Sequence, residues 1–125
     1  MYPTNNNLSF TGRVIMPKKS SLAKKYGSDI AEIISSAQPQ LKNLAEKNNL
    51  IVRISNYSNL YNEVGLLGAL VQKEPTNRQD ILKNILERIN IFSDQNRKTF
   101  IPNSKNFSKN TLINEITKLA EKLKK

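Results

Sequence analysis

One serine and two lysine pairs near the start of the chain are the first residues whose types and spacing could do chemistry. Ser21 and Lys24 match the Ser-x-x-Lys pattern, which in a helix places an amine one turn from a hydroxyl whose proton it can accept. The Ser-Asp-Asn and Lys-Thr-Gly elements that accompany this pattern in that class of enzymes are missing. The pattern also arises readily by chance in a chain rich in Ser and Lys. We therefore interpret Ser21 as a helix-capping residue and Lys24 as a solvated lysine, and we expect no enzymatic activity.

Other catalytic and metal chemistry is restricted by composition. The chain contains no Cys and no His, so it has no thiolate nucleophile, no disulfide and none of the commonest metal ligands or general bases. Gly65 and Gly68 lie inside an apolar run rather than in a phosphate-binding loop of the Walker or Rossmann form. We expect no metal and no cofactor.

The basic residues are concentrated at the two ends of the chain. The net charge is +10: residues 1–28 carry +5 without any acid, residues 29–92 are balanced, and residues 93–125 carry +5. Clustered cations favour a polyanion through counterion release. Genome composition is an alternative source of lysine, because Lys, Asn and Ile all have codons rich in A and T. The candidate nucleic-acid-binding residues are Arg13, Lys18, Lys19, Lys24, Lys25, Lys118, Lys122, Lys124 and Lys125.

The expected function is that of a small basic binding module that contacts nucleic-acid backbone, either RNA or DNA. Five Arg against fifteen Lys argue for nonspecific backbone contact rather than bidentate reading of bases. Tyr26, Tyr57 and Tyr61 could stack on bases, although half-buried structural roles are more common for such tyrosines. The alternative is a protein-interaction adaptor for an acidic partner, with charge that is mainly compositional. A lysine surface that joins both chain ends would favour nucleic acid, and an exposed sheet face bearing Ile15, Ile51 and Leu67 would favour a protein.

The N-terminal half predicts a strand followed by two helices. Residues 9–16 alternate partly and end at Pro17, and a two-turn helix capped by Ser20 or Ser21 runs to Tyr26. Gly27 suits the left-handed residue that ends this helix. An apolar stripe at intervals of three and four then predicts one kinked helix that begins at Ser28 or Asp29 and runs to about residue 47, with Asp29-x-x-Glu32 as a capping box. Two abutting helices split near Pro39 are the alternative.

The second half predicts a hairpin and two amphipathic helices. Residues 50–57 and 63–72 are the strands, although a helix is the alternative for the Leu-rich second segment. Thr76-x-x-Gln79 predicts a capping box for a helix that reaches residue 92. "TFIP" could add a short edge strand. We divide the chain into a disordered tail (1–8), an α+β core domain (9–93), a polar connection (94–109) and a C-terminal amphipathic helix packed on the core (110–125).

These elements predict an α+β two-layer sandwich. A small antiparallel sheet of about three strands carries helices on one face, in the order β-α-α-β-β-α-α. Through residue 92 this order is similar to that of the K-homology RNA-binding domain, which clamps nucleic-acid backbone with a Gly-x-x-Gly loop between its first two helices. The corresponding joint here is Gly27-Ser28-Asp29-Ile30, which lacks the second glycine and places a carboxylate beside the phosphate. The chain is therefore not assigned to that family.

Targeting signals are not visible. Lys follows the apolar "RVIMP" rather than preceding it, and no apolar run reaches the roughly 20 residues of a membrane span. We expect a cytoplasmic protein. The last helix lacks a large aromatic anchor and fits a core position, so we do not expect membrane binding through it.

Overall fold

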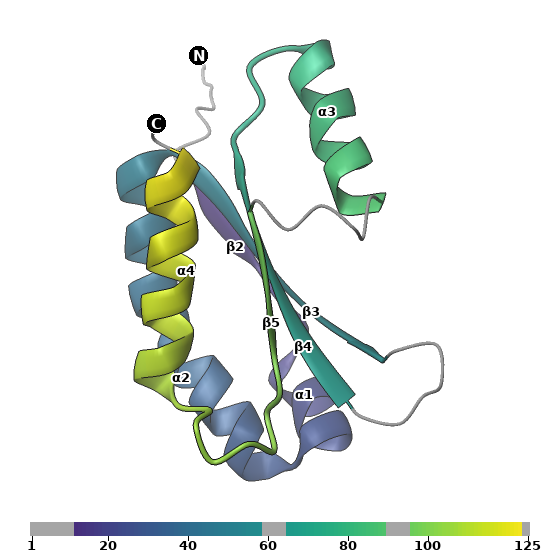
Figure 1. The fold of residues 1–125 in the computed structure, drawn as a ribbon, viewed down its shortest axis with the longest axis vertical. Helices are drawn as coiled ribbons and strands as arrows, with labels where there is room; N and C mark the ends of the chain where they lie inside the picture. Colours follow the sequence, from purple (N-terminus) through teal and green to yellow (C-terminus); the bar gives the residue numbers. More distant parts are fainter. Residues whose placement is uncertain (1–11, 59–64, 90–95, 124–125) are drawn as a thin grey trace, which may run out of the picture.

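The computed structural model describes residues 12–58, 65–89 and 96–123 (Figure 1). The expected tail at residues 1–8 lies outside these ranges. The described elements follow the order β-α-α-β-β-α-β-α, so the predicted α+β class is confirmed. They are β2 (Arg13–Ile15), α1 (Lys19–Tyr26), α2 (Ser28–Asn48), β3 (Leu50–Ser58), β4 (Gly65–Lys73), α3 (Arg78–Ile89), β5 (Arg97–Phe100) and α4 (Lys109–Leu123).

The sheet has four strands in the order β2-β3-β4-β5 and is mixed rather than purely antiparallel. β3 and β4 form the expected hairpin, which settles the Leu-rich segment as a strand. β2 pairs parallel to β3, because α1 and α2 carry the chain back to the same end of the sheet before β3 begins. The fourth strand, β5, pairs antiparallel to β4 and lies within the segment expected to be a polar connection. It overlaps the "TFIP" stretch that suggested an edge strand.

The main core lies between one face of the sheet and two helices. Alternate β3 residues Leu50, Val52 and Ile54 are buried together with side chains of α2 and α4. α1 packs against α2, and the Tyr26 hydroxyl donates a hydrogen bond of 2.6 Å to the Leu66 carbonyl of β4. Half-burial and this bond give Tyr26 a structural role. The Tyr57 side chain and Tyr61 fall outside the described part.

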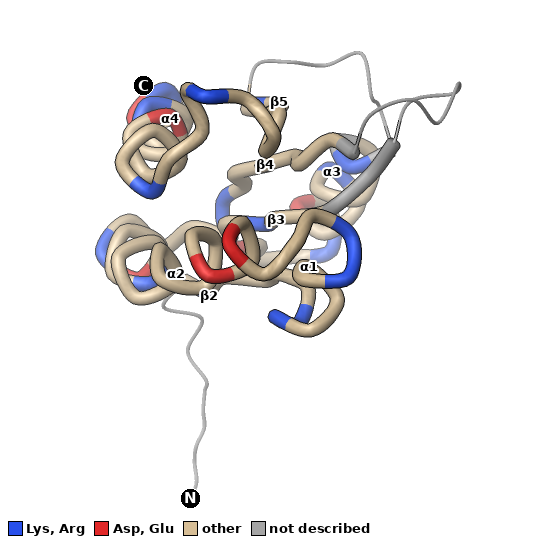
Figure 2. The backbone as a smooth tube through the Cα atoms, turned by 90° about the horizontal axis from the view of Figure 1, so that it is seen from below, with Lys and Arg blue, Asp and Glu red and all other residues tan. Residues whose placement is uncertain are grey.

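Helix α3 lies over the opposite face of the sheet, so the prediction that all helices share one face is wrong. Figure 2 shows α2 and α4 on one side of the strands and α3 on the other. Two hydrogen bonds join α3 to the end of β4: Gln72 Nε2 donates to the Asn84 carbonyl at 2.8 Å, and Asn84 Nδ2 donates to the Lys73 carbonyl at 3.1 Å. Amphipathicity predicted a helix here, but it could not indicate which face of the sheet the helix would cover.

The helix starts differ from the predicted caps. α1 begins after Lys18 and α2 after Gly27, and neither start has a side-chain capping hydrogen bond, so the predicted Ser20 or Ser21 and Asp29 caps do not form. At α3 the cap lies one residue further along than predicted. The Asn77 Oδ1 atom accepts from the Asp80 backbone N–H at 2.8 Å. α2 continues through Pro39 as one helix, as predicted.

Gly12 allows β2 to pass close to the C-terminal turn of α2. Its φ is 98°, and a Cβ atom there would lie 2.1 Å from the Ala45 carbonyl oxygen. Gly27 also has positive φ, at 99°, as expected for the residue that ends α1, but a Cβ there would meet open space. Gly12 is therefore constrained by both backbone conformation and space.

Within the described ranges, none of the helices is long and apolar enough to cross a membrane.

Candidate anion-binding site

All five arginines of the chain are associated with the face of the sheet opposite the main core, or with α3, which covers it. Register places Arg53 opposite Leu70 and Leu70 opposite Arg97, so Arg53 and Arg97 flank one residue on the same face. Arg13 is paired with Ile51, two residues from Arg53 on this face. We call the following set the arginine face: Arg13, Arg53 and Arg97 from the sheet, with Arg78 and Arg88 from α3.

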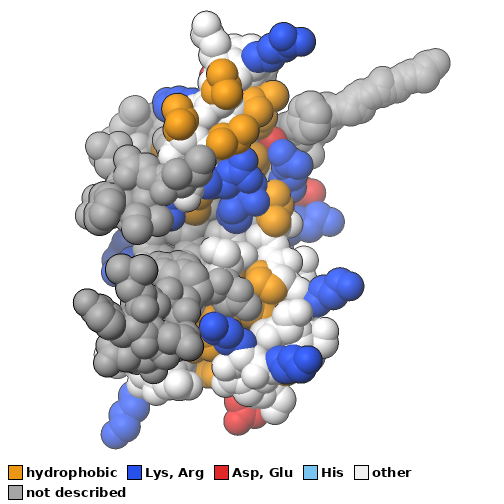
Figure 3. Space-filling view, turned by 90° about the vertical axis from the view of Figure 1, so that its right-hand side faces the viewer, with side chains coloured by type: hydrophobic (Ala, Val, Ile, Leu, Met, Phe, Trp, Pro, Cys, Tyr) orange, Lys and Arg blue, Asp and Glu red, His pale blue; other side chains and the backbone are white. Residues whose placement is uncertain are grey.

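A hollow of about 540 Å³ separates α3 from the sheet within the arginine face. Four of the residues that line it are arginines, and none of its described lining residues is acidic. Its apolar lining comes from Ile51 of β3, Pro75 and Ile81 of α3. Figure 3, which views the molecule from the side of α3, shows basic side chains gathered beside hydrophobic ones in its upper part. The arrangement is suited to an anion.

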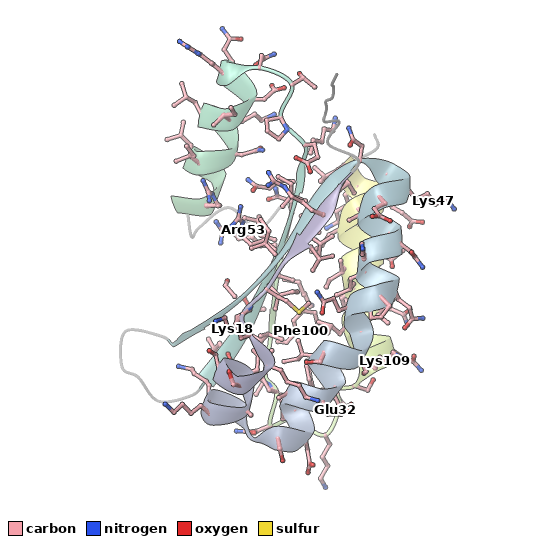
Figure 4. All side chains as sticks on the ribbon, turned by 180° about the vertical axis from the view of Figure 1, so that it is seen from behind. Lys18, Glu32, Lys47, Arg53, Phe100 and Lys109 are labelled. Atoms are coloured by element: carbon pink, nitrogen blue, oxygen red, sulfur yellow. The ribbon has the colours of Figure 1, made fainter. Side chains whose placement is uncertain are left out.

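Arg53 is the central cation of this hollow. Its guanidinium is partly buried, and its Nε atom has no hydrogen-bond partner among the described residues. Burial, followed by repulsion from Arg88 and Arg13, lowers the pKa of Arg53. Figure 4 shows Arg53 on the side of the sheet that faces α3. A buried donor that lacks a hydrogen-bond partner and is surrounded by like charges is destabilised. A hydrogen-bond acceptor that carries negative charge would stabilise it.

Nearby carboxylates neutralise only part of the arginine face. Glu74 is 5% exposed and pairs with Arg13, with 3.2 Å between its Oε2 and the arginine Nε. Asp80 accepts from both the backbone N–H and the hydroxyl of Thr76, and these two bonds lower the pKa of its carboxyl. Arg13, whose own side chain is half exposed, is thus paired with a buried carboxylate, and the Asp80 carboxylate is hydrogen-bonded at the start of α3.

The lysines that sequence analysis selected lie in two separate places. Lys18, Lys19, Lys24 and Lys25 belong to α1 or its start, whereas Lys118 and Lys122 belong to α4. Figure 1 places α1 at one end of the molecule and the C-terminal end of α4 at the other, so the two groups do not form one surface. Lys19 pairs with Glu32, and Lys118 pairs with Glu115 at 3.2 Å. Lys124 and Lys125 lie outside the described residues.

Of the predicted site residues, only Arg13 belongs to the arginine face. Sequence analysis did not select Arg53, Arg78, Arg88 or Arg97, because it weighted clusters along the chain and residues 29–92 are neutral as a whole. One signal was present. The alternation in β3 places Arg53 on the face opposite Leu50, Val52 and Ile54, and so on the face that this apolar row does not occupy.

The Ser-x-x-Lys pattern lies on the surface of α1. Ser21 and Lys24 are both exposed on α1. Within the described part of the chain, no group of three His, Cys, Asp or Glu residues is placed to hold a metal ion.

Comparison of the chain with protein-family models, with curated proteins and with solved structures gives no match. The likeness to the K-homology domain remains one of predicted element order, and function has to be argued from the arginine face.

Proposed function

We propose that this protein is a non-enzymatic binding module that contacts the phosphate backbone of nucleic acid at the arginine face. The observation that carries the proposal is the concentration of all five arginines at this face and its covering helix, around a hollow with no described acidic lining residue. Guanidinium groups donate paired hydrogen bonds to phosphate oxygens and are weakly hydrated, so they suit a partly buried phosphate contact.

The lysines take a secondary place in this proposal. Lysines of α1 could extend a basic surface, since Figure 3 shows further basic side chains toward the lower end of the face that it views, where Figure 1 places α1. Of the α4 lysines, Lys122 lines a neighbouring hollow that shares Gln72, Thr76 and Asn84 with the arginine hollow. Backbone contact by lysines adds to affinity but carries no sequence information.

The alternative is an adaptor for an acidic protein, and one observation counts against it while another favours it. The three residues that we associated with a protein partner do not share one face, because Ile15 and Ile51 lie on the side of the sheet that faces α3 and Leu67 lies on the core side. Ile51 and Leu67 are also buried. Helix α3, however, exposes three large aliphatic side chains beside the arginines, and an acidic peptide could cover them: Ile81, Leu82 and Leu86.

Fluorescence anisotropy with labelled single- and double-stranded oligonucleotides of DNA and RNA tests the proposal. We would titrate wild type, R53Q/R88Q and K42Q/K47Q across a range of salt concentrations. The last variant loses the same charge from the exposed surface of α2, on the other side of the sheet. Loss of two phosphate contacts should reduce the slope of log K against log salt by about 1.4 for a single strand.

We expect R53Q/R88Q to bind at least tenfold more weakly with the reduced slope, and K42Q/K47Q to resemble wild type. Equal losses in both variants would mean that net charge, and not the arginine face, drives binding. Changing Lys18, Lys19, Lys24 and Lys25 together to Gln tests the α1 lysines in the same assay. A loss there with R53Q/R88Q unchanged would move the interface to α1.

A further inference from the structure

The surface beside the arginine hollow has an unusual apolar content. Only four large hydrophobic side chains are exposed among the described residues, and three of them belong to α3. Their exposed fractions are 47% for Ile81, 61% for Leu82 and 64% for Leu86. Ile81 lines the hollow, whereas Leu82 and Leu86 lie on α3 outside its lining, and the fourth side chain, Ile101, follows β5. An isolated exposed leucine needs no explanation, but three on one short helix mark a contact surface.

Cations stand at both ends of this apolar stretch. Arg78, Leu82 and Leu86 are spaced four residues apart and so lie in one row along α3. Arg88 lies near the other end of the helix and lines the hollow together with Ile81. Arg88 is two residues beyond Leu86 and therefore lies on another side of α3, and the segment from residue 78 to residue 88 extends over roughly 15 Å along the helix axis. A ligand that fits α3 therefore carries negative charge on either side of groups with apolar faces.

Resting on the proposed function, we infer that the arginine face and the exposed row of α3 select single-stranded over double-stranded nucleic acid. A duplex keeps the faces of its bases inside the stack and presents phosphates and groove edges, which leave Leu82 and Leu86 without an apolar contact. An unpaired strand can turn its bases onto these side chains and onto guanidinium planes while its phosphates meet the arginines.

The shape of the site separates this ligand from two other anionic surfaces. Arg53 is partly buried in the hollow, so the flat headgroup surface of an anionic bilayer could touch α3 without reaching it, whereas a flexible strand can enter. A second copy of the chain is a poor occupant, since both copies carry a net charge of +10 and would bring their arginines together.

The test uses the full chain with a labelled oligothymidylate of about 12 nucleotides, within the usual range of single-strand site sizes, and a duplex of the same length. The variant L82Q/L86Q removes the apolar row and keeps every charge. I101Q is its control, because it removes an exposed aliphatic side chain that does not belong to α3. Each protein is titrated with both ligands across salt, and with anionic phosphatidylserine vesicles.

We expect wild type to bind the single strand at least tenfold more tightly than the duplex. L82Q/L86Q should lose about tenfold in single-strand affinity with an unchanged salt slope, because the number of neutralised phosphates stays the same. I101Q should behave as wild type. Duplex binding as tight as single-strand binding, with L82Q/L86Q unaffected, would overturn the inference and leave the proposed function standing.

Failure of R53Q/R88Q to weaken any oligonucleotide complex would instead overturn the proposed function. Vesicle binding that depends on Leu82 and Leu86, without single-strand binding, would replace nucleic acid with a membrane surface.

Discussion

Arg53 of β3 and Arg88 of α3 line the same hollow, and after burial itself it is repulsion from Arg88 that does most to lower the pKa of Arg53. Hydrogen bonds through Asn84 join α3 to β4, the strand that pairs with β3, so the fold holds two like charges on either side of one space. Such an arrangement costs free energy in the absence of an anion. Sites that bind ligands often retain this kind of cost, because the ligand removes it.

Removal of Arg53 should therefore leave the fold intact. We expect R53Q to change the free energy of unfolding by no more than about 0.5 kcal/mol at high salt and to stabilise the protein at low salt, where repulsion from Arg88 and Arg13 is least screened. Urea unfolding followed by far-UV circular dichroism at two salt concentrations measures this. A clear loss of stability at low salt would show that Arg53 supports the fold rather than a ligand.

The exposed row of α3 and the buried face of α4 should respond differently to truncation. Ile116 is fully buried between α4 and the rest of the core, so I116A should cost about 2 to 5 kcal/mol of unfolding free energy. Leu82 is largely exposed, and L82A should change the free energy of unfolding by less than about 0.5 kcal/mol. The same denaturation experiment checks both. A large cost for L82A would mean that Leu82 has a packing partner within the chain.

Gly12 should tolerate no side chain. G12A combines a positive φ with a Cβ placed 2.1 Å from the Ala45 oxygen, and we expect it to cost about 2 kcal/mol or more. G27A is the matched control, because it has almost the same φ with open space around the added atom. G12A should therefore lower the thermal midpoint more than G27A. Equal effects would mean that backbone conformation alone, and not the approach of β2 to α2, sets the requirement.

The start of α3 should depend on pH through Asp80. Hydrogen bonds from Thr76 hold the pKa of this carboxyl below its ordinary value of about 3.9. A depressed folded-state pKa means that the stabilisation is present above about pH 4 and disappears as the pH falls through the folded-state value. D80N should reduce helicity of the first turn of α3 at neutral pH, and its difference from wild type should vanish in acid.

Carbon chemical shifts of residues 78–83 measured across pH report this helicity. D29N is the control, since Asp29 lies in the first turn of α2, whose start has no side-chain capping bond. A pH-independent difference between D80N and wild type would contradict the role of the charge.

Much of the fold could be predicted from local patterns, since period and length identified α2, α3, α4 and the β3–β4 hairpin. The parallel pairing of β2 and the placement of α3 depend on contacts between distant residues, such as Gln72 with Asn84, which no local pattern encodes. The predicted caps failed because α1 begins after Lys18 and α2 begins after Gly27, and neither of these residues makes a side-chain capping hydrogen bond.

The candidate site was harder to predict than the fold. Lysines that are adjacent in sequence attract notice, whereas the arginines come from four different elements: β2, β3, α3 and β5. Only strand pairing brings Arg53 and Arg97 onto either side of Leu70. Clustering along the chain was therefore a poor guide to clustering in space.

The measurement that tests the central claim most directly is a two-dimensional ¹H–¹⁵N NMR titration of the protein with a single-stranded oligonucleotide. It observes backbone amides together with the Nε–H signals of the five arginines. Binding at the arginine face predicts that the Nε–H signals of Arg53 and Arg88 shift first, with the amides of α3, while the exposed residues of α2 and α4 remain unchanged. Shifts confined to the lysines of α1 and α4, with the Arg53 and Arg88 signals unmoved at saturation, would contradict it.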